Sequence, residues 1–362
     1  MPVLLSAAGA LRDRHKGRTV TYSRKVFLPI TNLCRDRCSY CTFRKNPGDP
    51  GAWTMTPQEI EEWLQRGHEQ GCKEALMCLG DKPERVYPEY RETLARLGCN
   101  TTTEYVYQAC EMALARGLLP HTNAGVLSYG EMRLLKSVNA SLGLMLENVS
   151  PRLRWKGMAH GAAPDKDPEV RIGMLREAGE LALPFTTGIL VGIGETRKER
   201  VDSLIAIREI HQTYGHIQEV IIQNFRAKPD TGMAGFPEPD GFEMARTVAT
   251  ARLVLGGEMN IQAPPNLNPE DHRLLLRAGI NDWGGISPVS KDYINPEAAW
   301  PQVRQLEQTC REEAFQLRER LAVYAEYIDR PGFLSPDLRN RASEMLERIG
   351  KSHEASAAAR LS

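Results

Sequence analysis

The sequence predicts an α/β protein built as a full or partial parallel βα (TIM-like) barrel, with its functional site at the C-terminal edge of the strands. Short runs rich in apolar and β-branched residues alternate with helical patterns, as in repeated βα units. Several of these runs are apolar at consecutive positions, as expected of strands that are covered on both faces. At least six such units fall within about 200 residues, which favours a barrel. An open doubly wound sheet remains the alternative.

Eight segments are strand candidates. The six clearest are Lys25–Ile30, Glu74–Leu79, Leu119–Asn123, Ser141–Glu147, Phe185–Val191 and Gln218–Asn224. Weaker candidates follow at Asn260–Ala263 and Ile280–Ile286. The helices between them have recognisable beginnings. After the first strand, for example, Thr56 is an expected N-cap, Pro57 suits the first helical position and Glu59 suits the capping glutamate.

This pattern divides the chain into three parts. Residues 1–21 precede the first strand candidate and form an N-terminal arm. Residues 22–330 contain the βα units and a C-terminal extension that we expect to complete the site. Residues 331–362 form a helical segment and a tail, and we expect the tail after Lys351, which is rich in Ala and Ser, to be disordered.

Composition excludes several classes of partner. The chain has 362 residues, of which 41% are hydrophobic and 25% charged, as in ordinary globular proteins. Lys plus Arg and Asp plus Glu both number 46, so no net field attracts nucleic acid or an anionic membrane. No apolar run reaches the ~18 residues that span a bilayer, and the N-terminal apolar stretch lacks the basic region of a signal peptide. We therefore expect a cytoplasmic protein with no nucleic-acid or membrane partner.

Three closely spaced cysteines indicate a metal centre. Cys34, Cys38 and Cys41 follow directly on the first strand with the spacing C-x3-C-x2-C. Thiolates bind iron and zinc. Structural zinc sites need four protein ligands, and neither His15 nor His68 completes a tight spacing. Three ligands suit an iron–sulfur cluster with one open iron. A zinc-stabilised binding module without catalysis is the alternative from a different class.

The remaining cysteines show no spacing that would hold a second cluster, and we expect most of them to be small buried residues. They are Cys72, Cys78, Cys99, Cys110 and Cys310.

The triplet, with Tyr40 before its last cysteine, is similar to the signature of the radical S-adenosylmethionine (SAM) superfamily. The resemblance implies that Cys34, Cys38 and Cys41 bind a [4Fe–4S] cluster whose open iron is chelated by SAM. It also implies that an electron from an external donor cleaves SAM to a 5′-deoxyadenosyl radical, which abstracts hydrogen from a substrate. In that superfamily the cysteine loop follows the first strand of a βα barrel, as it does here.

A glycine-rich turn is a candidate cofactor contact. Gly192, Gly194 and Glu195 lie where the Phe185–Val191 strand passes into a helix. Glycines at such a turn permit close approach of the backbone to a ligand. The turn resembles the adenine-side loop of the superfamily, and an ordinary strand-to-helix turn is the alternative.

Four further residues resemble SAM-binding positions of the superfamily. Glu147 closes an otherwise apolar strand candidate, where a carboxylate needs a donor, and the resemblance implies a contact to the ribose or amino group of SAM. Arg171 resembles the arginine that holds the cofactor's carboxylate, and a solvated surface arginine is the alternative. Gly80 and Asp81 end the second strand, where the superfamily places contacts to the methionine amino group.

A longer resemblance runs from about Tyr22 to Tyr327. The blocks YSRKVFLPITNLCRDRCSYCTFRKNPGDPGAWTM, EALMCLGDKPE and GINDWGGISPVSKDYINPE, among others, look like the first subunits of the FO synthase family. The resemblance implies that a companion subunit joins a hydroxybenzyl group to 5-amino-6-ribitylaminouracil. This chain would then cyclise that adduct to a deazaflavin and release ammonia. The alternative is a related radical SAM ring-forming enzyme of deazaflavin or menaquinone synthesis with another substrate.

Substrate contacts are expected from polar and aromatic residues near the later strands. Amides suit the edge of a uracil, and a tryptophan offers a stacking face. The candidates are Gln223, Asn224, Arg226, Asn266, Asp282 and Trp283. We expect the GINDWGG block to follow the last barrel strand and to face the substrate. Ring closure requires a base, and Asp282, Glu104 and His121 are the candidates, with no order among them.

Overall fold

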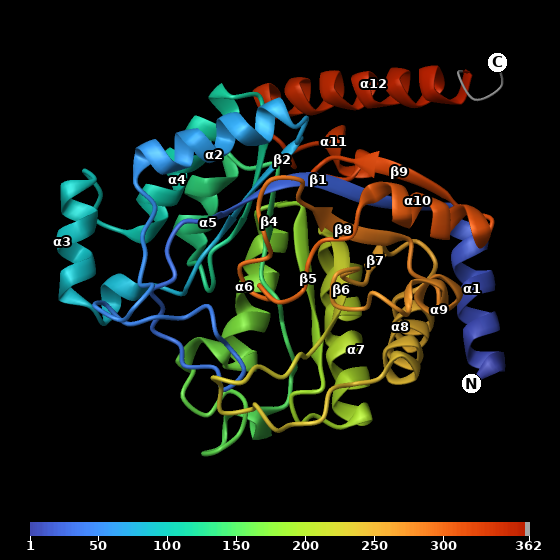
Figure 1. The fold of residues 1–362 in the computed structure, drawn as a ribbon, viewed down its shortest axis with the longest axis horizontal. Coiled ribbons are helices and arrows are strands. Elements are labelled where there is room, and N and C mark those ends of the chain that lie inside the picture. Colours follow the sequence, from blue (N-terminus) through green and yellow to red (C-terminus); the bar gives the residue numbers. More distant parts are fainter. Residues whose placement is uncertain (359–362) are drawn as a thin grey trace.

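The computed structural model of the chain describes residues 1–358 and contains a closed barrel of eight parallel strands surrounded by helices (Figure 1). The strands are β1 (Thr19–Pro29), β2 (Glu74–Cys78), β3 (Leu119–Asn123), β4 (Ser141–Gly143), β5 (Phe185–Val191), β6 (Ile217–Asn224), β7 (Ile261–Gln262) and β8 (Asp282–Ile286). Each strand from β2 to β7 pairs with the next, and β1 pairs with both β8 and β2, which closes the ring. The prediction of a full barrel is confirmed, and the open sheet is excluded.

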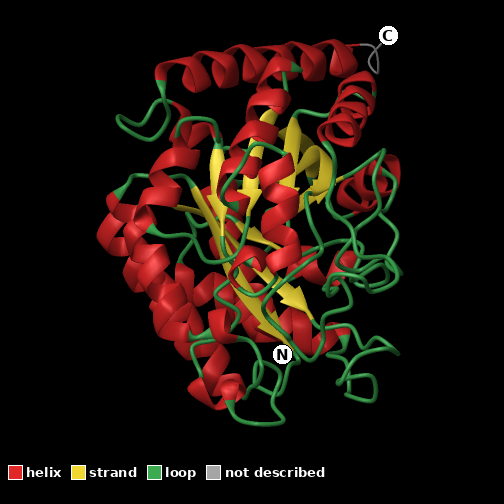
Figure 2. Cartoon of the chain, turned by 90° about the vertical axis from the view of Figure 1, so that its left-hand side faces the viewer, coloured by secondary structure: helices red, strands yellow, loops and turns green. Residues whose placement is uncertain are grey.

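Helices cover the outside of the barrel (Figure 2). Twelve α-helices lie within the described residues: α1 (Pro2–Lys16), α2 (Pro57–Glu69), α3 (Pro88–Arg96), α4 (Thr102–Ala115), α5 (Tyr129–Lys136), α6 (Pro168–Glu180), α7 (Arg197–Tyr214), α8 (Gly241–Leu255), α9 (His272–Arg277), α10 (Val303–Glu312), α11 (Ala325–Ile328) and α12 (Pro336–Ala358). Three short 3₁₀ turns lie at Pro83–Arg85, Pro151–Arg154 and Pro164–Lys166. The predicted capping box of α2, with Thr56 as N-cap and Glu59 as its partner, is confirmed. Of the helices in residues 1–358, none is both long and apolar enough to cross a membrane.

A ninth strand, β9 (Gln316–Arg320), was not predicted from the sequence. It pairs in parallel with the first half of β1, from Thr19–Gln316 to Ser23–Arg320, whereas β2 pairs with the second half of β1. The chain after β9 then crosses the N-terminal end of the barrel. Ala322 O accepts hydrogen bonds from Ser141 Oγ (2.7 Å) on β4 and from Gln218 Nε2 (3.1 Å) on β6. The C-terminal segment therefore closes the end of the barrel that lies opposite the C-terminal ends of the strands.

The ends of the chain are integrated more closely than the sequence suggested. Helix α1 docks onto the barrel, because Arg12 Nη1 donates to the carbonyls of Leu276 (3.0 Å) and Ile280 (2.6 Å). The first strand begins at Thr19, so the predicted boundary at residue 21 lies inside a strand. Helix α12 lies along one edge of the molecule and continues to Ala358, past the start of the predicted tail at Lys351 (Figure 1). The last four residues of that tail lie outside the described part of the chain.

Candidate functional site

The cysteine loop follows β1 at the C-terminal edge of the barrel. Cys34, Cys38 and Cys41 line one cavity of about 220 Å³. The N–H of Asp81 donates to Cys34 Sγ at 3.1 Å, and the N–H of Cys41 donates to Cys38 O at 3.1 Å. Burial raises the pKa of the Cys38 thiol to about 12. Three thiols are thus held together at the mouth of the barrel.

Gly80 lets the end of β2 pack against this loop. A Cβ atom on Gly80 would lie 2.2 Å from Leu33 O and 2.5 Å from Cys34 Cβ. No side chain fits there without moving the first cysteine. Gly80 and Asp81 both line the cysteine cavity. Their contact to SAM stays a prediction.

Charged side chains form another wall of the same cavity. Glu147 pairs with Lys166, with 2.5 Å between Oε1 and Nζ, and its backbone φ is 64°. Arg171 is buried, and it donates from Nε to Asp165 O (3.0 Å) and from Nη1 to Met145 O (2.5 Å). Arg171 is therefore not the solvated surface arginine of the alternative interpretation.

Tyr40 and His160 make up a further part of the site. The Tyr40 hydroxyl lies 3.2 Å from His160 Nε2, and Tyr40 lines the cavity. Burial lowers the pKa of His160 to about 2, so this imidazole is neutral at physiological pH.

The residues present fit the two cofactors of a radical SAM enzyme. Three thiolates would hold a [4Fe–4S] cluster and leave one iron free, and the N–H of Asp81 already points to one sulfur. Beside them, Glu147 offers an anion, while Lys166 and Arg171 offer cations. The amino and carboxylate groups of SAM need both signs of charge, so this wall suits the methionine part of SAM.

The glycine turn after β5 does not line this cavity. Gly192 and Gly194 have φ values of 101° and 98°. The carboxylate of Glu195 accepts from the N–H groups of Gly192 and Ile193, both at 2.8 Å, and from Arg200 Nε at 2.6 Å. The Glu195 carboxylate therefore accepts hydrogen bonds from the backbone of its own turn. The alternative of an ordinary strand-to-helix turn accounts for all of these contacts.

The two amides at the end of β6 have different surroundings. Gln223 lines the cysteine cavity. Asn224 is buried, donates to Leu267 O at 3.0 Å and accepts from Asn268 Nδ2 at 2.9 Å. Gln223 therefore remains a candidate for substrate or cofactor binding, whereas Asn224 fixes the loop after β7.

Two further substrate candidates lie away from the cysteine cavity. The Arg226 side chain is 39% exposed and pairs with Glu238 at 3.0 Å. Asn266 Nδ2 donates to Asp292 Oδ2 at 2.9 Å. Their contacts hold loops together, and neither residue lines the cavity.

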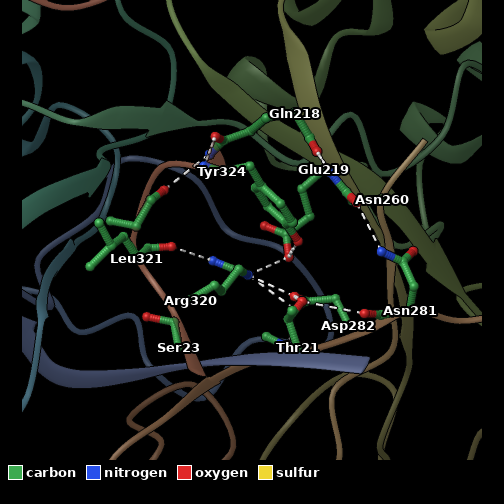
Figure 3. Close-up of polar contacts among 12 residues, drawn as sticks. Thr21, Ser23, Gln218, Glu219, Asn260, Asn281, Asp282, Arg320, Leu321 and Tyr324 are labelled. Carbon is green, nitrogen blue, oxygen red and sulfur yellow. Dashed lines mark hydrogen bonds and ion pairs between the residues drawn. The ribbon is translucent and has the colours of Figure 1, made fainter. Parts of the chain in front are cut away.

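The expected position of Asp282 and Trp283 is wrong. Instead of following the last barrel strand, Asp282 begins β8 and pairs with Thr21 near the start of β1, at the N-terminal end of the barrel (Figure 3). It is fully buried and bound to Arg320, with 2.6 Å between Oδ2 and Nε. Trp283 is also fully buried, and its ring packs edge-on against His272 with 5.0 Å between centroids. Trp283 belongs to the core, because alternation along β8 turns it away from the barrel interior.

The other two base candidates are separated by the fold. Glu104 accepts the N–H of Asn100 at 2.6 Å and forms the capping box of α4 with Thr101, which explains its carboxylate without catalysis. His121 is buried on β3 and lines a second cavity inside the barrel. Burial lowers the pKa of His121 to about 4.

Sequence reasoning missed several charged residues of the site and the barrel interior. Lys166 ends a 3₁₀ turn and has no sequence signature. Glu219 lies inside the apolar run of β6. A charged residue at an inward position of a buried strand could have indicated a polar group in the barrel interior. Arg320 could not be placed, because β9 itself was not predicted.

Comparisons with known proteins agree with this geometry. Residues 28–206 match the Radical SAM superfamily, whose cofactors are a [4Fe–4S] cluster and SAM. Among solved structures, methylornithine synthase (PylB) superimposes with a TM-score of 0.67 at 19% identity, covering 87% of this chain and 88% of that one. The hydrogenase maturase HydG from Carboxydothermus hydrogenoformans gives 0.73 at 15% identity, covering 98% of this chain and 85% of that one. These likenesses show the fold.

Closer relatives define the family. The chain is 48% identical over 331 residues to 7,8-didemethyl-8-hydroxy-5-deazariboflavin synthase of Methanopyrus kandleri, covering 91% of this chain and 97% of the relative. It is 47% identical to the synthase of that name from Methanothermobacter thermautotrophicus, covering 91% of this chain and 99% of the relative. It is 49% identical to FO synthase of Mycobacterium tuberculosis, covering 90% of this chain and 40% of that longer protein. With its three cysteines at the mouth of a closed βα barrel, the chain belongs to the 7,8-didemethyl-8-hydroxy-5-deazariboflavin (FO) synthase family of radical SAM enzymes.

Proposed function

We propose that the chain cyclises the hydroxybenzyl–ribityluracil adduct, 5-amino-5-(4-hydroxybenzyl)-6-(D-ribitylimino)-5,6-dihydrouracil, to 7,8-didemethyl-8-hydroxy-5-deazariboflavin and releases ammonia as a lyase. The observation that carries the proposal is the single cavity that joins three thiols to Glu147 and Arg171, in a chain that is almost half identical to deazariboflavin synthases over their full length. This relationship favours the main interpretation over a related ring-forming enzyme with another substrate.

In this proposal the bound cofactors supply a 5′-deoxyadenosyl radical, and the chain positions the reactants. Glu147, Lys166 and Arg171 orient the methionine end of SAM. The apolar residues Leu144 and Leu190 line the same cavity and exclude water from the reacting groups. Gln223 lines this cavity, and in this proposal its amide hydrogen-bonds the substrate or the cofactor.

Removal of a proton during ring closure needs a base inside the barrel. Of the three candidates, His121 alone lines the interior cavity that adjoins the cysteine cavity, and it is therefore the base that this proposal retains. Asp282 is bound to Arg320, and Glu104 caps α4, so neither is retained as the base.

We also propose that the adduct comes from a companion subunit. The relative from Mycobacterium tuberculosis is named FO synthase, and this chain spans 40% of it. The remaining length of that protein is available for the activity that forms the adduct. An external electron donor must reduce the cluster. None of the eight cysteines forms a disulfide, as is usual for proteins of a reducing compartment, and we therefore place the chain in the cytoplasm.

An anaerobic assay tests this function. The protein with its reconstituted cluster is reduced and incubated with SAM and the adduct. Formation of a fluorescent deazaflavin, with 5′-deoxyadenosine and ammonia, is the expected result. Cys38→Ala serves as the inactive control. Cleavage of SAM without any deazaflavin from the adduct would overturn the substrate assignment while leaving the radical SAM chemistry intact.

A further inference from the structure

A second cavity, of about 100 Å³, lies inside the barrel between the cysteine cavity and the closed N-terminal end. It adjoins the cysteine cavity, because Asn123 and Met145 line both. Its volume is several times what one water molecule needs. Among the groups that line it are Lys25, Glu74, His121, Glu219, Gln262 and Arg320. A barrel interior with this many polar side chains differs from the packed apolar layers that usually fill a small barrel.

The floor of this cavity is fixed by ion pairs and hydrogen bonds. Arg320 Nη2 donates to Glu219 Oε1 at 2.8 Å, and the Tyr324 hydroxyl donates to the same oxygen at 3.2 Å (Figure 3). Arg320 also donates hydrogen bonds to both carboxylate oxygens of Asp282. The polar groups of the floor are therefore already used within the protein.

The wall at His121 presents a lone pair to the cavity. Ser141 Oγ donates its single hydrogen to Ala322 O at 2.7 Å. The same hydroxyl lies 2.6 Å from His121 Nδ1, so it must accept the hydrogen of Nδ1. The neutral imidazole then carries no hydrogen on Nε2. His121 Nε2 is thus an acceptor, and no described residue donates a hydrogen bond to it.

Three more polar side chains that line this cavity have unused hydrogen-bonding capacity. The Lys25 ammonium lies 5.6 Å from the ring centroid of Phe27 and 5.2 Å from that of Trp300. Within residues 1–358, its Nζ and the side-chain amides of Gln262 and Asn123 have no hydrogen-bond partner. Lys25, Gln262 and His121 are buried, and buried polar groups normally have a partner. Together with the partly buried Asn123 they form a preformed set of donors and acceptors.

Two glycines of the GINDWGG block make room for this set. A Cβ on Gly284 would lie 2.0 Å from Gln262 Nε2, and a Cβ on Gly285 would lie 2.6 Å from Lys25 Nζ. The two glycines of this block therefore leave room for the polar groups of the interior cavity, whereas Asp282 and Trp283 do not line it.

We propose that this cavity binds an uncharged polyhydroxylated chain of the substrate, which for the adduct is its ribityl group. Two cationic residues, Lys25 and Arg320, and two acidic residues, Glu74 and Glu219, line the cavity, so it holds charges of both signs and does not select for an anion. A hydroxyl both donates and accepts, and it can therefore satisfy Lys25, His121 Nε2 and the two amides in turn. The inference rests on the proposed function, because that function supplies the ribityl chain.

The test compares two ligands on one variant. Gln262→Leu removes an amide at nearly constant shape, and Gln58→Leu, on the exposed surface of α2, is the matched control. Each SAM-loaded holoenzyme is titrated with the adduct and with an analogue that carries a methyl group in place of the ribityl chain. We expect Gln262→Leu to bind the adduct about tenfold more weakly and the analogue within about twofold of wild type. Gln58→Leu should bind both as wild type does.

Unchanged affinity for the adduct, or equal weakening for both ligands, would overturn the proposal. Equal weakening would mean that the cavity binds the uracil ring, which both ligands share. If Gln262→Leu loses its cluster or fails to fold, Lys25→Met is measured in the same way with the same expected result. Deazaflavin formation by wild type is recorded in parallel. If the variant loses ribityl binding selectively but wild type forms no deazaflavin, the proposed function is rejected and the assignment of the cavity to a polyhydroxylated chain stands. If wild type forms deazaflavin but the variant shows no such selectivity, the proposed function stands and the assignment of the cavity is rejected.

Discussion

Arg320 and Asp282 form a buried ion pair at the N-terminal end of the barrel, with Nε–Oδ2 at 2.6 Å and Nη2–Oδ1 at 3.0 Å. Asp282 pairs with Thr21 of β1, and the cysteine loop begins beyond Pro29, so about 26 Å of strand separates the pair from the cluster ligands. Asp282 is fully buried, and Arg320 comes from the segment that closes the barrel. The pair therefore acts on folding rather than on the radical chemistry.

Asp282→Asn should destabilise the protein and leave its chemistry largely intact. Removing one partner of a buried ion pair typically costs about 3–5 kcal/mol, because the other charge stays buried without compensation. Arg320 keeps Glu219 as a second carboxylate partner, which reduces this cost. We expect a clearly lower melting temperature, with turnover per cluster-containing folded molecule within about threefold of wild type, far less than the ~10² or more expected for loss of a catalytic base. Measuring both quantities on one preparation decides between the two roles, and a large loss of turnover at normal stability would restore Asp282 to catalysis.

Gly80→Ala should lower iron content. The new Cβ would lie 2.5 Å from Cys34 Cβ and 2.2 Å from a backbone carbonyl, so the first cluster ligand must move. Gly130→Ala on α5 is the matched control, because nothing lies within 4 Å of its Cβ position. We expect iron and sulfide content after reconstitution to fall for Gly80→Ala alone. Equal cluster content in both variants would show that the β2 end tolerates a side chain.

The sequence predicted the barrel well, because apolar runs and capping boxes are local signals. Leu119–Asn123 and Phe185–Val191 match strands β3 and β5 residue for residue. Predicted site residues that follow a strand closely, such as Cys34 and Gly80, line the cysteine cavity. Placement failed for Asp282 because a two-residue β7 and an unpredicted β9 decide which end of the barrel it faces. The pairing of strands that are far apart in the chain cannot be recognised from a local sequence pattern.

Each cysteine of the triplet should be essential for the cluster. Cys34→Ala, Cys38→Ala and Cys41→Ala each leave a second iron without a protein ligand, so we expect loss of the brown absorption and of SAM cleavage. Cys310, buried in α10, supplies the control, and Cys310→Ala should keep both. A triplet variant with full iron content and normal 5′-deoxyadenosine release would refute the assignment.

Glu147→Gln and Arg171→Ala should keep the cluster and weaken SAM binding. Both line the cysteine cavity beside Lys166. A charge-assisted hydrogen bond contributes about 1.5–3 kcal/mol, which corresponds to a roughly tenfold or greater loss of affinity. Titration with SAM checks this result. Arg226→Ala, on the pair with Glu238 outside the cavity, is the control and should bind normally.

His121 should make the stability of the protein depend on pH. Its folded-state pKa is lowered from 6.5 to about 4, first because burial disfavours the charged imidazolium, with Lys25 and Arg320 adding repulsion that Glu74 partly offsets. The unfolded chain therefore binds a proton that the folded chain refuses, and stability falls as pH drops through 6.5 toward 4. Between pH 7 and pH 5 this residue should remove about 2 kcal/mol from the free energy of unfolding. In His121→Gln that contribution is absent, while the other buried histidines remain and cancel in the comparison. Anaerobic urea unfolding of both proteins at each pH measures the difference. We expect the wild-type value to fall more steeply on acidification than that of the variant, and parallel curves would show that His121 titrates normally and is not sealed inside the barrel.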